Sequence, residues 1–106
     1  MNSEGYNGWT NYETWYINLV LLSELTCEDI GIEVDNYDCD TERGQLDLVY
    51  DTSKALEEWT SMVFNEHYEL PDLASSMVNV FLGDVNYYEI AKHTCEDFVD
   101  PENFKR

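Results

Sequence analysis

The chain of 106 residues carries 23 Asp and Glu against five Lys and Arg, which gives a formal net charge of -18 at pH 7. A field of this sign repels nucleic acid and anionic membranes, so direct binding to either is excluded and a cationic partner is favoured. The hydrophobic content of 43% is enough to build one core in a chain of this length. We therefore expect a single acidic helical domain over residues 1–106, with frayed ends at residues 1–5 and 102–106.

The first predicted helix covers residues 11–25. Thr10 followed by Glu13 has the spacing of a capping box, in which a hydroxyl and a carboxylate satisfy backbone N–H groups at a helix start. Apolar residues then recur at three- and four-residue steps and extend around almost the whole helix; they include Tyr12, Trp15, Tyr16, Leu19, Leu22 and Leu25. We therefore expect this helix to lie at the centre of the fold, with other elements packed around it.

The segment after this helix fits two structures. Ile30 and Val34 would share one face of a helix capped near Asp29, whereas Ile30, Ile32 and Val34 also alternate as in a strand. The helix is favoured, and a short β segment within residues 30–50 is the alternative.

A long helix is predicted from Gly44 to about residue 65, because apolar residues recur there at helical spacing; they are Leu46, Val49, Tyr50, Leu56, Trp59, Met62 and Val63. A short strand over residues 46–50, followed by a helix capped near Thr52, is the alternative for this stretch.

Two more helices are predicted in the last third of the chain. Pro71 suits the first turn of a helix over residues 71–82, and Gly83 suits its C-terminal cap. Asn86 has the position of an N-cap for a last helix that carries Glu89 in its first turn and runs until Pro101. The fold class is thus all-α, a compact bundle of four to five helices.

Carboxylates are concentrated in the middle of the chain, where apolar residues between them argue against a solvated tail. We call this set the acidic pole and predict that it binds the partner; it comprises Glu28, Asp29, Glu33, Asp35, Asp38, Asp40, Glu42, Asp47, Asp51, Glu57 and Glu58.

No metal site or disulfide framework is recognisable. The three cysteines are odd in number and lack C-x-x-C spacing, so reduced thiols are expected, with an approach of Cys27 and Cys39 as the alternative and Cys95 as a core residue. Asp38, Asp40 and Glu42 alternate as in a calcium loop, but the following residues lack the Gly and the Glu that such a loop needs. Stability should therefore depend on no metal, cofactor or disulfide.

Catalytic and targeting signals are also missing from the sequence. No nucleophile, base and orienting group can be named together, so we expect no enzyme. The longest apolar run, residues 15–22, is interrupted by Asn18 and is too short to span a bilayer. No Lys or Arg precedes Arg43, so we expect no secretory signal. We therefore expect a cytoplasmic protein.

Both ends of the chain resemble a known family. The segment YNGWTNYETW at residues 6–15, followed by INLVLL, and the segment VNYYEIAKHTCED at residues 85–97 resemble the opening and closing signatures of small uncharacterised proteins encoded by phages, plasmids and other mobile elements. The resemblance implies an all-helical fold and a mobile-element origin, and it supplies no catalytic residues. The acidic middle matches this family least.

The opening motif has two interpretations. Its turn, cap and aromatic residues would fix the start of the first helix against the bundle. Alternatively, Trp9, Asn11, Tyr12 and Trp15 would form a binding pocket, because Trp and Tyr are common anchors of interfaces.

Acidity and the family resemblance together predict an inhibitor that mimics DNA. Such a protein presents carboxylates where a basic, DNA-binding host protein expects phosphates, for example a restriction enzyme or a CRISPR effector. It would act in the host cytoplasm as an anti-restriction or anti-CRISPR protein of a phage. The alternative is a non-catalytic interaction module that binds through an aromatic surface, with acidity serving solubility.

Overall fold

The computed structural model describes residues 8–66 and 72–100, so the predictions for residues 1–5 and 102–106 lie outside the described residues. The elements are α1 (Tyr12–Ile17), a π-helical turn η1 (Asn18–Leu22), two 3-10 turns η2 (Glu28–Ile30) and η3 (Val34–Asn36), α2 (Glu42–Glu66), α3 (Asp72–Gly83) and α4 (Tyr87–Thr94). The described residues contain no strand. The all-α bundle is therefore confirmed, and the β segment within residues 30–50 is wrong.

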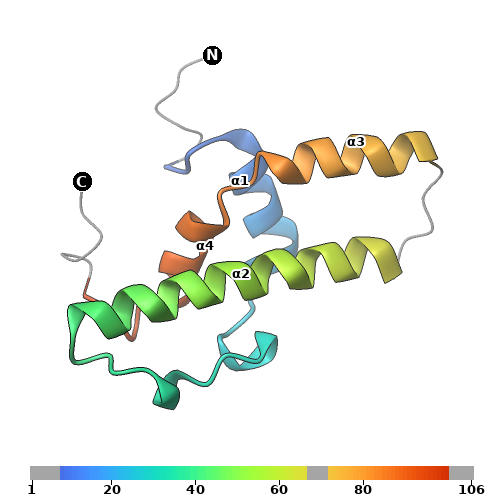
Figure 1. The fold of residues 1–106 in the computed structure, drawn as a ribbon. Coiled ribbons are helices and arrows are strands. Elements are labelled where there is room, and N and C mark those ends of the chain that lie inside the picture. The colour runs from blue at the N-terminus through green and yellow to red at the C-terminus, as the bar shows by residue number, and fades with distance from the viewer. Residues whose placement is uncertain (1–7, 67–71, 101–106) are drawn as a thin grey trace.

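The long helix α2 is the element around which the others are arranged (Figure 1). Helix α4 makes the most extensive contact with α2, and the turn η2 also packs against α2. Helix α3 runs back in the opposite direction to α2, and residues 28–41 lie on the side of α2 away from α3 (Figure 1). We call residues 28–41 the acidic segment.

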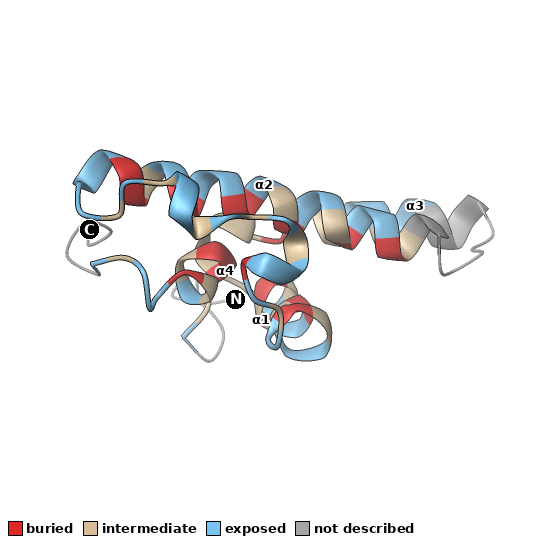
Figure 2. Ribbon diagram, turned by 90° about the horizontal axis from the view of Figure 1, so that it is seen from below, coloured by how far each residue is buried: buried red, intermediate tan, exposed pale blue. Residues whose placement is uncertain are grey.

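The core lies between α2, α4 and the first helical segment. Its most deeply buried apolar side chains are Leu48, Val49, Leu56, Ile90, Ala91, Ile17 and Leu22. Burial of one large apolar side chain contributes roughly 1.5–3 kcal/mol, so this cluster supplies much of the folding free energy. Figure 2 shows buried and exposed residues alternating along α2, which is the pattern of a helix with one face against the core.

The long helix is where the sequence predicts it, but its buried face is partly different. Tyr50 and Met62 belong to the apolar spacing that predicts the helix, yet they are 54% and 41% exposed. Leu48, Thr52 and Thr60 are fully buried instead. The Thr60 hydroxyl donates a 2.8 Å hydrogen bond to a carbonyl of its own helix, which removes most of the cost of burying it.

The first helix is shorter and less central than expected. Its helical conformation ends at Leu22, where a π turn closes with a 2.8 Å hydrogen bond from the Ser23 N–H to the Asn18 carbonyl. Leu19 and Val20 are 55% and 54% exposed, so the apolar surface around this helix is only partly covered. The N-cap is Asn11, not Thr10, because the Asn11 side chain accepts the Thr14 N–H at 2.9 Å.

The helix predicted near Asp29 is wrong in length, although its cap is present. The Thr26 hydroxyl and the Asp29 carboxylate each accept the other residue's backbone N–H, as in a capping box. Gly31 then adopts a left-handed conformation with φ of +82°, which ends η2 after one turn. Ile32 and Val34 are still half-buried and pack against the core.

Helix α4 begins as predicted, and α3 is described from Asp72, so the predicted role of Pro71 in its first turn lies outside the described residues. Asn86 caps α4 by accepting the Glu89 N–H at 3.0 Å. Helix α4 ends at Thr94 rather than continuing toward Pro101, and turns follow from Cys95. None of the described helices is long and apolar enough to cross a membrane.

Candidate functional site

All eleven carboxylates of the acidic pole are exposed. The ion pairs found among the described residues are Arg43 with Asp47 and Lys54 with Glu57, each with a nitrogen–oxygen distance of 3.8 Å and both exposed. Exposed pairs of this kind contribute little, about 0–1 kcal/mol each. The negative charge of the acidic pole is therefore displayed to solvent and is only slightly offset by these two contacts.

The acidic pole has two parts that lie next to each other. One part is the acidic segment with η2 and η3, and the other is the exposed face of α2. On α2, Asp47, Asp51 and Glu58 follow one another at steps of four and seven residues, so they share one face with spacings along the axis of about 6 and 10 Å. The result is a row of carboxylates on a rigid helix.

A groove of about 470 Å³ separates the acidic segment from the first turns of α2. Asp38, Asp47 and Asp51 line it together with Arg43. The Tyr37 hydroxyl donates a 2.6 Å hydrogen bond to the Asp51 carboxylate. The pKa of Tyr37 is raised to about 12, mainly by this hydrogen bond and to a smaller extent by burial. Tyr37 therefore remains a neutral donor at physiological pH and ties the acidic segment to α2.

Close backbone contacts fix the position of the acidic segment. A Cβ atom on Gly44 would lie 1.9 Å from the Asp38 carbonyl oxygen, so only glycine allows this approach. The Gln45 side chain donates to the Cys39 carbonyl at 2.7 Å and accepts the Asp100 N–H, also at 2.7 Å. The Gly44 and Gln45 contacts were not predicted, since they join residues that no helical or strand periodicity relates.

The alternating carboxylates of the calcium-like motif belong to a turn and a helix start. Asp38 accepts the Asp40 N–H at 3.2 Å, and Glu42 is the first residue of α2. Thr41 has the position of an N-cap, because its hydroxyl accepts the Gly44 N–H at 3.0 Å. Within residues 8–66 and 72–100, no group of three or more His, Cys, Asp or Glu is placed to hold a metal ion.

The residues of the opening motif have separate roles. The ring of Trp9 packs on His93 of α4 with a centroid distance of 4.5 Å. Asn11 caps α1 and donates to the Asp84 carbonyl at 2.8 Å, whereas Tyr12 and Trp15 contact each other along α1. These contacts attach the start of α1 to the segment around α4, which supports the structural interpretation of the motif.

An apolar surface joins the first helical segment to α3. Phe81 makes edge-to-face contacts with Tyr12 and Tyr16, at centroid distances of 6.4 and 6.1 Å. We call this the aromatic face; its exposed members are Tyr12, Tyr16, Leu19, Val20, Met77 and Val80. The sequence predicts an aromatic surface at the opening motif. The exposed side chains of this surface are Tyr12 and Tyr16, together with those of α3, whereas Trp9 and Trp15 are half-buried.

Two thiols that the sequence analysis did not pair lie in contact. The Sγ atoms of Cys27 and Cys95 are 3.7 Å apart, and both residues are buried. Cys95 is a core residue, as predicted. The structure places Cys95 rather than Cys39 against Cys27. No local spacing signals this pair, because the two cysteines are separated by 68 positions.

Fold and surface together define a small all-helical protein with an acidic face and an aromatic face. A family model of unknown function, DUF7249, matches residues 2–100, so the chain belongs to the DUF7249 family. No curated protein and no solved structure matches the chain.

Proposed function

We propose that this protein binds a basic, DNA-binding protein and occupies the surface where that partner holds phosphates. The observation that carries the proposal is the exposure of all eleven carboxylates of the acidic pole on a fixed framework. Charge of one sign that is held in place steers a cationic partner and favours its docking. The proposal requires no catalytic group, metal or cofactor.

The dimensions of α2 suit a DNA mimic. Its acidic-pole carboxylates lie between Glu42 and Glu58, about 24 Å along the helix axis and roughly two thirds of one turn of duplex DNA. Duplex DNA carries about one negative charge per 1.7 Å of its axis, so a partner that reads phosphates has a long basic surface. The row of carboxylates on α2 and the carboxylates of the adjacent acidic segment would face such a surface together.

The resemblance of both chain ends to mobile-element proteins suggests the kind of partner. A phage or plasmid gains from blocking host nucleases, so a restriction enzyme or a CRISPR effector is the proposed target class. Such a protein would inhibit its target by competition with DNA in the cytoplasm of the host.

Charge reversal of the acidic segment tests the proposal. Glu33, Asp35, Asp38, Asp40 and Glu42 are replaced by Lys, because these exposed side chains avoid Asp51, which holds Tyr37. The tagged protein is used to capture partners from nuclease-treated host lysate at low and high salt, and captured proteins are assayed for duplex binding by fluorescence anisotropy. We expect the protein to capture a basic partner and to displace DNA from it, and the variant to do neither.

The matched control reverses five exposed carboxylates elsewhere on the described surface: Glu24, Asp84, Glu96, Asp97 and Asp100. It carries the same net charge as the test variant and should retain most binding. Circular dichroism confirms that both variants remain helical. Equal losses from the two variants would show a diffuse charge effect, and full binding by the test variant would refute phosphate mimicry.

The aromatic face supports a second candidate, a non-catalytic interaction module. Val80 and Leu19 are 72% and 55% exposed, and apolar groups at this exposure on neighbouring helices are typical of a binding surface. Replacement of Leu19 and Val80 by Ser leaves the acidic pole unchanged. Loss of partner binding in this variant, together with full binding by the charge-reversal variant, would favour the module over the mimic.

A further inference from the structure

The buried thiol pair joins two elements that are distant in sequence. Cys27 immediately precedes η2, and Cys95 immediately follows α4. Their sulfur atoms are 3.7 Å apart, and a disulfide bond is about 2.05 Å long. A shift of roughly 1.6 Å would therefore bring the two sulfurs to bonding distance.

The two thiols differ in their protonation. The hydrogen bond with Cys95, helped by the Thr52 hydroxyl and opposed by burial, lowers the pKa of Cys27 to about 7. The same bond and burial raise the pKa of Cys95. Both directions favour the thiolate on Cys27 over a thiolate on Cys95. Thiolate is the form of cysteine that reacts with oxidants.

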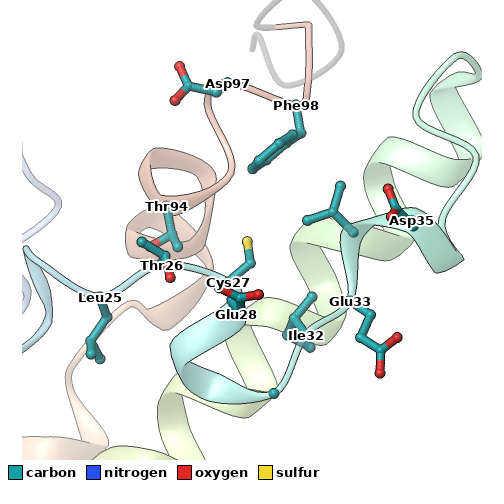
Figure 3. A pocket seen from close by; sticks show the side chains of 12 residues that line it. Leu25, Thr26, Cys27, Glu28, Ile32, Glu33, Asp35, Thr94, Asp97 and Phe98 are labelled. Carbon is teal, nitrogen blue, oxygen red and sulfur yellow. The ribbon is translucent and has the colours of Figure 1, made fainter.

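Access to the pair is also unequal. Cys27 lines a surface hollow of about 790 Å³ between the acidic segment and the turns after α4, whereas Cys95 is not among its lining residues. Figure 3 shows the Cys27 side chain in this hollow, with Thr94 on one side and the Phe98 ring beyond it. Phe98 also lines the hollow and is 43% exposed. Cys27 is itself only 3% exposed, so this hollow is the route by which a small oxidant would reach its sulfur.

We propose that Cys27 and Cys95 form a peroxide-sensitive dithiol that closes to a reversible disulfide. The Cys27 thiolate attacks one peroxide oxygen, the O–O bond breaks, and the leaving oxygen departs as water after taking up a proton. Cys27 is then a sulfenic acid. The Cys95 sulfur attacks the Cys27 sulfur, and the sulfenic oxygen leaves as a second water with the Cys95 proton. Two thiols are oxidised, and one peroxide is reduced to two waters.

The disulfide would change how the acidic segment is held. It would connect the residue before η2 covalently to the end of α4 and close a loop of 68 positions. A cross-link of this kind restricts the unfolded chain, so the oxidised protein should unfold at a higher temperature than the reduced protein. Glu28, Glu33 and Asp35 of the acidic pole also line the hollow beside Cys27, but oxidation of the thiols needs no partner, so this inference stands independently of the proposed function.

Peptide mapping of the intact folded protein tests the proposal. Reduced protein is treated with hydrogen peroxide, alkylated with iodoacetamide and digested without reductant for mass spectrometry. We expect a peptide that links Cys27 to Cys95, an alkylated Cys39, and loss of the link after treatment with dithiothreitol. Burial, followed by the charge of Asp38, raises the pKa of Cys39, so it should react more slowly. The Cys39→Ser variant is the matched control and should form the same link.

Single variants separate the two roles. In Cys95→Ser, the sulfenic acid on Cys27 has no thiol to resolve it, so dimedone should label Cys27. In Cys27→Ser, Cys95 should not be labelled at the same peroxide concentration. A link between Cys27 and Cys39, preferential oxidation of Cys39, or a folded protein whose thiols all survive peroxide would each overturn the proposal. Peptide mapping of the wild-type protein tests the proposed Cys27–Cys95 disulfide even where a serine variant fails to fold.

Discussion

The backbone N–H of Asn86 donates a 2.8 Å hydrogen bond to the Thr14 hydroxyl, which in turn donates to the Asn11 side chain at 2.7 Å. One buried hydroxyl thus connects the two N-cap residues. The Glu89 carboxylate accepts the Thr10 N–H at 2.8 Å and completes the contact from the other side. The N-termini of α1 and α4 therefore cap each other, which explains why the NGWTNYETW and VNYYEIA segments meet in the fold.

Removal of this hydroxyl should destabilise the protein. Thr14→Val keeps a similar shape but leaves the Asn86 N–H without its acceptor, which should cost about 1–3 kcal/mol. Urea unfolding followed by circular dichroism measures the loss. Thr26→Val is the control, because the Thr26 hydroxyl accepts an exposed, longer bond of 3.3 Å. Equal effects of the two substitutions would contradict the role assigned to Thr14.

Gly44 and Gly83 should respond in opposite ways to alanine. Gly83 is the last residue of α3, and a Cβ there would meet nothing within 4 Å, so Gly83→Ala should stabilise the protein slightly, by less than the roughly 1 kcal/mol of a helix interior. A Cβ on Gly44 would collide with the Asp38 backbone, so Gly44→Ala should cost about 1–2 kcal/mol net. Thermal unfolding of both variants provides the comparison, and a stabilised Gly44→Ala would show that the acidic segment is not held as described.

Tyr37 should make the stability of the protein fall at high pH. Its pKa is raised from 10.0 to about 12, so the folded state holds this proton more tightly than the unfolded state. The resulting stabilisation is complete below pH 10 and is lost as the pH rises through 12. Tyr37→Phe should show a smaller loss of stability over this range.

Ultraviolet absorbance of tyrosinate measures the titration directly. Asp51→Asn removes the charge that retains the proton, so in that variant Tyr37 should ionise at a lower pH. Tyr87, whose pKa burial raises to about 12, should be unaffected and serves as the internal reference. An unchanged titration in Asp51→Asn would mean that Asp51 does not govern Tyr37.

A chelator should leave the melting temperature unchanged, because the described part of the chain groups no three metal-binding side chains. Differential scanning calorimetry with and without EDTA measures this. A fall in the melting temperature would reveal a structural metal that the sequence and the fold both fail to indicate.

The start of α4 was predicted from the sequence because its cap is local, whereas the cap of α1 was placed on Thr10 and is Asn11. Asn86 and Glu89 lie within one turn of each other, so their spacing alone indicates the cap. The buried face of α2 was predicted less well, since Thr52 and Thr60 are fully buried and a search for apolar periodicity passes over them. Thr52 contacts Cys95 from α4, and no property of α2 alone could reveal that partner.

Most of the acidic pole could be named from the sequence because exposed carboxylates need no partner to be recognised. The groove between its two parts could not, because it depends on Gly44 approaching the Asp38 backbone and on Tyr37 reaching Asp51. The Cys27–Cys95 contact could not be predicted from the sequence for the same reason, because it exists only where the residue before η2 packs against the residue after α4.

The mutual capping of α1 and α4 also has a consequence for synthesis on the ribosome. Helix α1 has only six residues, far below the length at which an isolated helix is stable in water, and its partners Asn86 and Glu89 are translated much later. At about 5–20 residues per second, the nascent chain spends several seconds with α1 unsupported. During that interval the apolar residues of α1 and η1 are available to chaperones. The native fold should then form in one late step, once residue 89 has emerged from the ribosome.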